Sequence, residues 1–180
     1  MRFELRRAHT GDVAKLAELI ERSVRGLQRF HYSQCQIEGA LRRVFGVDSQ
    51  LITDGTYFVV TPDSDPNLIV GCGGWSRRAT LYGGDQWLGR EESFLDPNCD
   101  AAKIRAFFVH PEWTRRGIAT LILDHCESAI REAGFTWAEL GSTLTGVPLY
   151  AAHGYIERER SEAELDDGLT LSIIRMEKTL

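Results

Sequence analysis

The residues with the clearest chemical potential lie in one short segment, AFFVHPEWTRRGIAT, at residues 106–120. An apolar run ends at Pro111, which has no amide donor and therefore ends a strand. A turn around Gly117 then opens a helical pattern, and such a turn leaves backbone N–H groups pointing at one spot. Gly117 has no side chain to obstruct a phosphate, and Arg115 and Arg116 add positive charge beside it. The segment predicts a site for a phosphorylated ligand.

This segment resembles the signature motif of the GCN5-related N-acetyltransferases, the GNAT family. In that motif a glutamine or arginine, two residues, a glycine, one residue and a glycine or alanine hold the pyrophosphate of coenzyme A. Gly117 and Ala119 match the last two positions, whereas Thr114 replaces the glutamine or arginine. The contacts in the family are mostly made by the backbone. The resemblance implies that the pyrophosphate of acetyl-CoA is bound by Arg115, Arg116, Gly117, Ile118, Ala119 and Thr120.

A second segment, LYAAHGY at residues 149–155, is similar to the short-helix motif of the same family. A tyrosine there precedes a glycine–aromatic pair by four residues, and the pair is Gly154-Tyr155 instead of the commoner Gly-Phe. Upstream, Thr143 stands where the family often has asparagine, and Gly146 where it has alanine. The resemblance implies that Tyr150 is a general acid that protonates the leaving thiolate, and that Thr143 contacts the cofactor.

The reaction that the resemblance implies is direct attack of an amine on the thioester of acetyl-CoA. A backbone N–H at Phe108 or Val109 would stabilise the thioester oxygen where the central strand separates from its neighbour. A general base, or a chain of water molecules, must take the proton of the amine. The sequence does not single out this base, and the candidates by residue type are His31, Glu92, His110, Glu112 and His153.

Composition narrows the class of protein. The chain of 180 residues is 43% hydrophobic and 26% charged, as in ordinary globular proteins. Its net charge of −5 argues against a nucleic-acid partner. No stretch has the apolar length that a signal peptide or a membrane helix needs, so we expect a cytoplasmic protein without a membrane partner.

Metal and redox chemistry find no support in the residue spacings. The four cysteines include no CxxC pair, and the histidines have neither HxxxH nor HExxH spacing. We therefore expect no metal cofactor and reduced, mostly packed thiols.

Hydrophobic periodicity predicts one α/β domain over residues 1–180, with helices on the faces of a mixed sheet. The expected element order is β-α-α-β-β-β-α-β-α-β-β, which resembles the GNAT acyl-CoA N-acyltransferase fold from end to end. Thr10 is a plausible cap of the first helix, and Ser33 of the second. The expected strands include residues 3–5, 56–61, 68–75, 106–109, 136–141 and 169–176, and the helices include residues 13–27, 118–133 and 148–153.

A connection of about 25 residues, 77–102, is longer than compact domains usually tolerate. It is either a surface excursion or a lid over the substrate site. In the second case Arg77, Trp87 and Arg90 would recognise an acidic or aromatic part of the substrate.

Three functions remain open. The leading one is an N-acetyltransferase that uses acetyl-CoA and acts on a primary amine of a small molecule or peptide. A non-catalytic acyl-CoA-binding or sensing module of the same fold is the alternative. An unrelated nucleotide-binding domain ranks last, because residues 106–120 lack the lysine of a P-loop and the spaced glycines of a dinucleotide site. The acceptor, the length of the acyl donor and the oligomeric state, including a homodimer, stay open.

Overall fold

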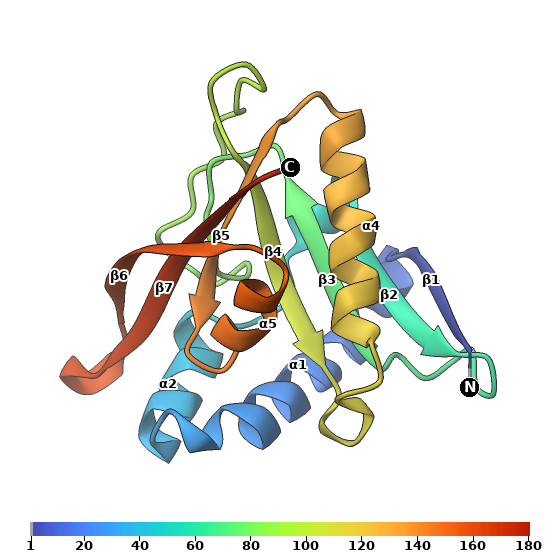
Figure 1. Cartoon of the computed structure of the whole chain (residues 1–180). Helices are drawn as coiled ribbons and strands as arrows, with labels where there is room; N and C mark the ends of the chain where they lie inside the picture. Colours follow the sequence, from blue (N-terminus) through green and yellow to red (C-terminus); the bar gives the residue numbers. More distant parts are fainter. Residues whose placement is uncertain (1) are drawn as a thin grey trace.

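The computed structural model describes residues 2–180 and consists of a seven-stranded mixed sheet with helices on both faces (Figure 1). The strand order is β1-β2-β3-β4-β5-β7-β6, and only β4 and β5 pair in parallel. The strands are β1 Phe3–Arg7, β2 Tyr57–Pro62, β3 Gly71–Ser76, β4 Ala102–Val109, β5 Trp137–Thr143, β6 Ile156–Glu164 and β7 Thr170–Thr179, and the helices are α1 Val13–Leu27, α2 Gln34–Arg43, α3 Ser49–Thr53, α4 Ile118–Glu132 and α5 Val147–Ala152.

The predicted mixed α/β fold is confirmed, with one helix more than expected. The additional helix is α3, which is a single turn too short to show helical periodicity. The predicted cap at Thr10 is wrong, because Thr10 already lies inside a 3-10 helix, Thr10–Asp12, whose N-cap is His9. There the Asp12 carboxylate accepts a hydrogen bond from the His9 backbone N–H at 3.0 Å.

Two hydrophobic cores lie on opposite faces of the sheet. One joins α1, α2 and α3 to alternate residues of β2, such as Tyr57 and Val59. The other joins α4 and α5 to the intervening residues Phe58 and Val60. This alternation is that of a sheet covered on both faces, and it explains why every residue of β2 is buried.

Strands β4 and β5 pair only at their amino-terminal ends. The register contains two pairs, Ala102 with Ala138 and Lys103 with Glu139, and the strands then separate. An ion pair between the Lys103 ammonium and the Glu139 carboxylate joins the last paired position. Figure 1 shows the two strands parting toward their carboxyl ends, with α5 beside the gap.

A bulge in β4 lies just beyond the point of separation. The register between β3 and β4 shifts so that two residues, Ala106 and Phe107, face the single residue Gly73. Ala106 has a φ of 57°, which is uncommon for a residue with a side chain. The bulge therefore bends β4 at the cost of local backbone strain.

The long connection over residues 77–101 is anchored to β4 by a buried charge. Arg105 Nη2 lies 2.6 Å from Asp48 Oδ2 and donates to the Gly83 carbonyl, also at 2.6 Å. Arg90 reaches the same carboxylate at 3.3 Å and the Gly84 carbonyl at 3.1 Å. Burial lowers the pKa of Arg105, while the adjacent Asp48 opposes that shift. The Asp48 carboxylate, bound by both arginines, thus holds residues 83–90 of the connection against β4.

The strain at Ala106 predicts opposite effects for two substitutions. Ala106→Gly removes the steric penalty of the left-handed conformation, so we expect the free energy of unfolding to hold or to rise by roughly 1 kcal/mol. Ala106→Val adds a β-branched side chain to that conformation, and we expect a loss of more than about 1 kcal/mol. Urea denaturation measures both. A Val variant as stable as the Gly variant would contradict the assigned backbone conformation.

The buried pair predicts a large effect of Asp48→Asn. Asparagine keeps the cap on the Leu51 N–H but leaves Arg105 without a counter-charge, so we expect a loss of about 3–5 kcal/mol in the free energy of unfolding. The matched control is Asp166→Asn, which removes a partly exposed carboxylate between Arg42 and Arg43 and should cost far less. Equal losses in the two variants would show that the Asp48–Arg105 pair does not anchor the fold.

Candidate functional site

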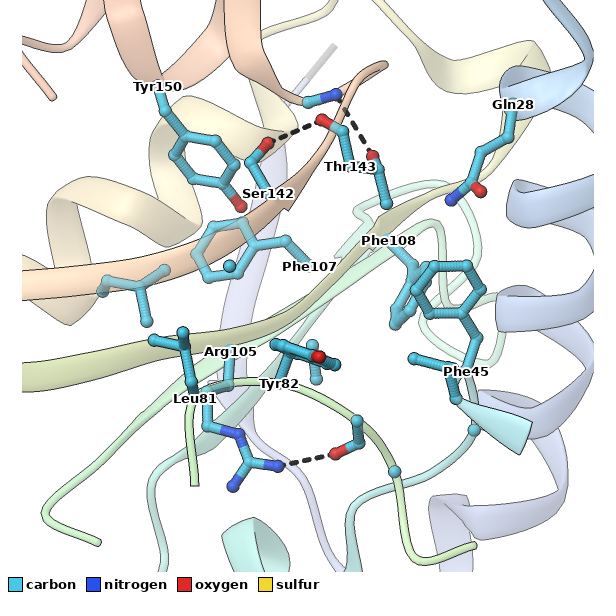
Figure 2. A pocket seen from close by; sticks show the side chains of 18 residues that line it. Gln28, Phe45, Leu81, Tyr82, Arg105, Phe107, Phe108, Ser142, Thr143 and Tyr150 are labelled. Carbon is cyan, nitrogen blue, oxygen red and sulfur yellow. Dashed lines mark hydrogen bonds between the residues drawn. The ribbon is translucent and has the colours of Figure 1, made fainter. Parts of the chain in front are cut away.

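A pocket of about 100 Å³ opens where β4 and β5 separate (Figure 2). One wall comes from β5 and α5, the opposite wall from Gln28 just after α1, residues 44–46 just after α2 and the long connection, and β4 forms the floor. Phe107 belongs to the core on the α4 side and Phe108 to the core on the α1 side, so the pocket passes from one face of the sheet to the other. The lining residues are Gln28, Val44, Phe45, Gly46, Leu81, Tyr82, Gly83, Gly84, Ile104, Arg105, Ala106, Phe107, Phe108, Gly141, Ser142, Thr143, Gly146 and Tyr150.

Tyr150 contributes a phenolic hydroxyl group to the β5–α5 wall. Its ring packs edge-on against Phe107, with 6.1 Å between the ring centroids, and against Tyr155 at 5.8 Å. The hydroxyl points from α5 toward Phe107 and Ser142 (Figure 2). Burial raises the pKa of Tyr150, so the phenol is protonated at neutral pH and available as a donor.

Of the two backbone N–H groups expected on β4, one points away from β3, although its residue, Val109, is not among those that line the pocket. His110 N–H donates to the carbonyl of Val70, the residue before β3, at 2.9 Å, so the alternating ladder turns Phe108 N–H toward β3 as well. Val109 N–H faces the opposite side, where Ser23 Oγ accepts it at 3.3 Å. Of the two residues expected from the sequence, only Val109 therefore directs its N–H away from β3.

The turn before α4 has the geometry of an anion site. Gly117 has a φ of 81° and caps the helix, and Arg115 has a φ of 60°. A Cβ built on Gly117 meets no atom within 4 Å, so the turn faces open space. The first helical hydrogen bond of α4 runs from Leu121 N–H to the Gly117 carbonyl. The N–H groups of Ile118, Ala119 and Thr120 consequently have no partner within the helix.

Side chains around this turn are held by short-range contacts. Thr114 Oγ1 donates to the Pro111 carbonyl at 3.1 Å. The Arg116 guanidinium lies 4.8 Å from the ring centroid of Trp113, in cation–π geometry. Thr143, expected from the sequence as a further contact, lies in the pocket wall, where its hydroxyl accepts from Gly146 N–H at 3.3 Å.

None of the five candidate bases lines the pocket. His153 Nδ1 lies 2.8 Å from the Leu149 carbonyl and His31 Nδ1 3.2 Å from Thr145 Oγ1. His110 Nδ1 accepts from Glu112 N–H, and the Glu92 carboxylate is exposed at 3.9 Å from Arg90. Residue type had suggested these side chains, but the structure brings none of them to the gap between β4 and β5.

The long connection forms part of the pocket through residues 81–84, although the side chains proposed for recognition lie elsewhere. Arg90 is engaged by Asp48, Arg77 lies 5.8 Å from the ring centroid of Trp75, and Trp87 packs on Tyr82 at 5.1 Å. Tyr82 itself is the aromatic residue of this connection that lines the pocket.

Several lining residues were not anticipated from the sequence. Phe107 carried a signal as part of the apolar run before Pro111. Gln28, Phe45, Arg105 and Ser142 carried none, since only the tertiary fold brings them to β4.

Residues 2–180 contain neither a cluster of metal ligands nor a helix that could span a membrane. No group of three or more His, Cys, Asp or Glu side chains in that range is arranged to hold a metal ion. No helix there combines the length and apolarity of a transmembrane segment. All four cysteines are free, with Cys72 and Cys126 buried and Cys35 and Cys99 exposed, so the expectation of mostly packed thiols holds for two of the four.

Solved structures share this fold over nearly the whole chain. A GCN5-related N-acetyltransferase of Rhodopseudomonas palustris has a TM-score of 0.72 at 19% identity, with 100% of this chain and 97% of that chain covered. The PaiA N-acetyltransferase of Thermoplasma acidophilum, in complex with coenzyme A, has a TM-score of 0.67 at 16% identity, with both chains fully covered. The putative acetyltransferase YncA of Salmonella typhimurium, with acetyl-CoA, has a TM-score of 0.63 at 16% identity, with 99% and 94% covered.

The sequence comparisons identify the family. No curated protein matches the chain significantly. The family model described as an acetyltransferase (GNAT) domain matches residues 53–157, more than half of the chain, from the end of α3 to the start of β6. This match spans the separated strands, the turn at Gly117 and Tyr150, and the protein belongs to the GNAT family of acetyltransferases.

Proposed function

We propose that this protein is an N-acetyltransferase, with residues 1–180 acting as one domain, that transfers the acetyl group of acetyl-CoA directly to a primary amine. Membership of the GNAT family gives acyl transfer as the class of activity. The observation that carries the proposal for this chain is the pocket between β4 and β5, because it passes through the sheet. A donor bound on one face can meet an acceptor bound on the other.

The turn before α4 fits the pyrophosphate of coenzyme A. Open space in front of Gly117, three helix-start N–H groups and two neighbouring arginines supply room, donors and positive charge. Thr114, which departs from the family motif, uses its hydroxyl within the turn and leaves ligand contacts to the backbone. Arg115, Arg116, Gly117, Ile118, Ala119 and Thr120 are the residues assigned to this contact. Thr143, in the wall formed by β5 and α5, would contact the pantetheine arm.

The residues of the pocket, together with Val109 at the end of β4, account for the transfer. The amine attacks as the neutral base, which costs roughly 4–5 kcal/mol at pH 7 for an amine of pKa ~10.4. Its nitrogen bonds to the carbonyl carbon while Val109 N–H, leaving Ser23, donates to the carbonyl oxygen. The carbon–sulfur bond breaks, the sulfur keeps the electron pair, and Tyr150 gives it a proton. The surplus proton of the amine passes to water, and the Tyr150 phenolate takes a proton back from water, which restores the phenol. The products are an N-acetyl amine and coenzyme A.

A sensing module that only binds acyl-CoA would need no acid in this wall. The protonated hydroxyl of Tyr150, directed into the pocket, is therefore the feature that favours the enzyme. Release of free thiol from acetyl-CoA in the presence of an amine panel separates the two functions.

The pyrophosphate site predicts that Gly117→Glu abolishes coenzyme A binding, because a carboxylate would occupy the space and repel the phosphates. The matched control is Gly55→Glu. Gly55 has a φ of 71° and also faces open space, but it lies in the α3–β2 turn at the opposite end of the strands. Isothermal titration calorimetry on both folded variants measures the effect. Wild-type affinity in the Gly117→Glu variant would rule out this site.

The acid role predicts that Tyr150→Phe lowers kcat on the order of 10²-fold, with little change in acetyl-CoA affinity. The low end of the range for acid catalysis is expected, because a thiolate of pKa ~8.5 is a tolerable leaving group. Tyr155→Phe is the matched control, since this ring packs on Tyr150 but does not line the pocket. Equal kcat values for the Tyr150→Phe variant and the wild type, with chemistry rate-limiting, would remove Tyr150 from the mechanism.

A further inference from the structure

Gln28 is a buried side-chain amide without a protein partner. It lies in the short 3-10 helix Gln28–Phe30 after α1, and only 6% of its surface is exposed. Its Oε1 is shielded from solvent and has no hydrogen-bond partner among the described residues. Its backbone is well tied, since the carbonyl accepts from His31 N–H at 3.0 Å and Tyr32 N–H at 3.1 Å. A rigid backbone therefore holds a polar group in a position that costs stability.

The amide faces the pocket at the separated strands. Gln28 is one of the lining residues, and Figure 2 shows its side chain reaching from the end of α1 into the pocket, on the wall opposite Tyr150. Thr143 lies between them at the rim in the same view. A ligand that spans the pocket would meet the Tyr150 hydroxyl at one end and the Gln28 amide at the other.

The surroundings of Gln28 are aromatic and uncharged. Phe45 packs edge-on against Phe108, with 5.9 Å between ring centroids, and Tyr82 extends this surface. Arg105 is the one charged residue among the lining residues, and its charge is already matched by Asp48 at 2.6 Å. The pocket thus offers apolar contact and a neutral hydrogen-bonding group, with no spare charge for a carboxylate, a phosphate or a second ammonium.

We propose that the acceptor is a primary amine carried on an aromatic or similarly flat apolar group, and that Gln28 Oε1 accepts a hydrogen bond from its nitrogen. The aromatic walls hold the apolar part, and the hydrogen bond turns the lone pair of the nitrogen toward the thioester. The amide is neutral and removes no proton, so Gln28 is a positioning residue. The inference rests on the proposed acetyl transfer and adds the class of its acceptor.

The first test compares acceptors. With wild-type protein and acetyl-CoA, 2-phenylethylamine should have a kcat/KM at least tenfold above those of spermidine and glutamate, measured by thiol release and by mass detection of the acetylated product. A preference for spermidine or glutamate would overturn the inference. Calorimetry with acetyl-CoA distinguishes a failure of the proposed function from a failure of the proposed acceptor class. Failure to bind acetyl-CoA would contradict the proposed function, whereas binding without turnover of 2-phenylethylamine would contradict only the acceptor class.

The second test changes Gln28. Gln28→Leu keeps the size of the side chain but removes the acceptor oxygen, so kcat/KM for 2-phenylethylamine should fall about 10–100-fold, mainly through KM, with acetyl-CoA affinity unchanged. Gln28→Glu retains an oxygen at the same reach and should recover most of the loss.

Stability separates a positioning role from a structural one. Because Gln28→Leu removes a buried amide without a partner, its urea midpoint should equal or exceed that of the wild type. A lower midpoint, or an unchanged KM for 2-phenylethylamine, would show that Gln28 supports the fold and does not contact the acceptor.

Discussion

The separation of β4 from β5 is the constraint on which the rest of the site depends. Two paired positions, closed by the Lys103–Glu139 ion pair, hold the strands together at one end. Arg175 of β7 reaches the same Glu139 carboxylate at 2.9 Å and reinforces that end. Beyond it the strands diverge, and the bulge at Ala106 bends β4 away. A gap in a sheet removes the strand that would pair with these backbone groups, which is why Val109 N–H bonds to the Ser23 hydroxyl and not to a neighbouring strand.

The walls of this gap are supplied by parts of the chain that are distant in sequence. The α1–α2 region and the connection over residues 77–101 cover one side, and α5 covers the other. Arg105 links the floor to the connection through Asp48 and the Gly83 carbonyl. The only charged lining residue is therefore used to build the pocket, and the polar side chains that remain, the Gln28 amide and several hydroxyl groups, are neutral. The Asp48–Arg105 pair thus both holds the connection in place and leaves the pocket without a spare charge, on which the proposed acceptor class depends.

Much of the fold follows from local patterns, because most elements have a clear hydrophobic period and distinct ends. Gly134 ends α4 with a φ of 89°, as its place after the periodic residues predicts. The strand predicted at residues 106–109 was too short, because β4 begins at Ala102, four residues before the apolar run. The reason is that Lys103 and Arg105 interrupt the apolar pattern that predicts a buried strand. Both side chains are buried because each is paired with a carboxylate.

Residues of the candidate site could be predicted from the sequence where they belong to a contiguous motif. Those that only tertiary packing brings together could not. Tyr150, Phe108 and Thr143 lie in the pocket, and Gly117 has the left-handed backbone that its motif requires. Gln28 and Phe45 became visible only through tertiary contacts. The five candidate bases were chosen by residue type, which does not indicate how far a side chain lies from the pocket. None of them lines the pocket, and the proposed mechanism therefore passes the proton to water.

A crystal structure of the protein with acetyl-CoA tests the central claim most directly. The account predicts the pyrophosphate against the N–H groups of residues 117–120 and the acetyl group between β4 and β5. It further predicts the carbonyl oxygen within hydrogen-bond distance of Val109 N–H, and the sulfur beside the Tyr150 hydroxyl. An acetyl group bound outside the gap, or a pyrophosphate away from the turn at Gly117, would contradict it.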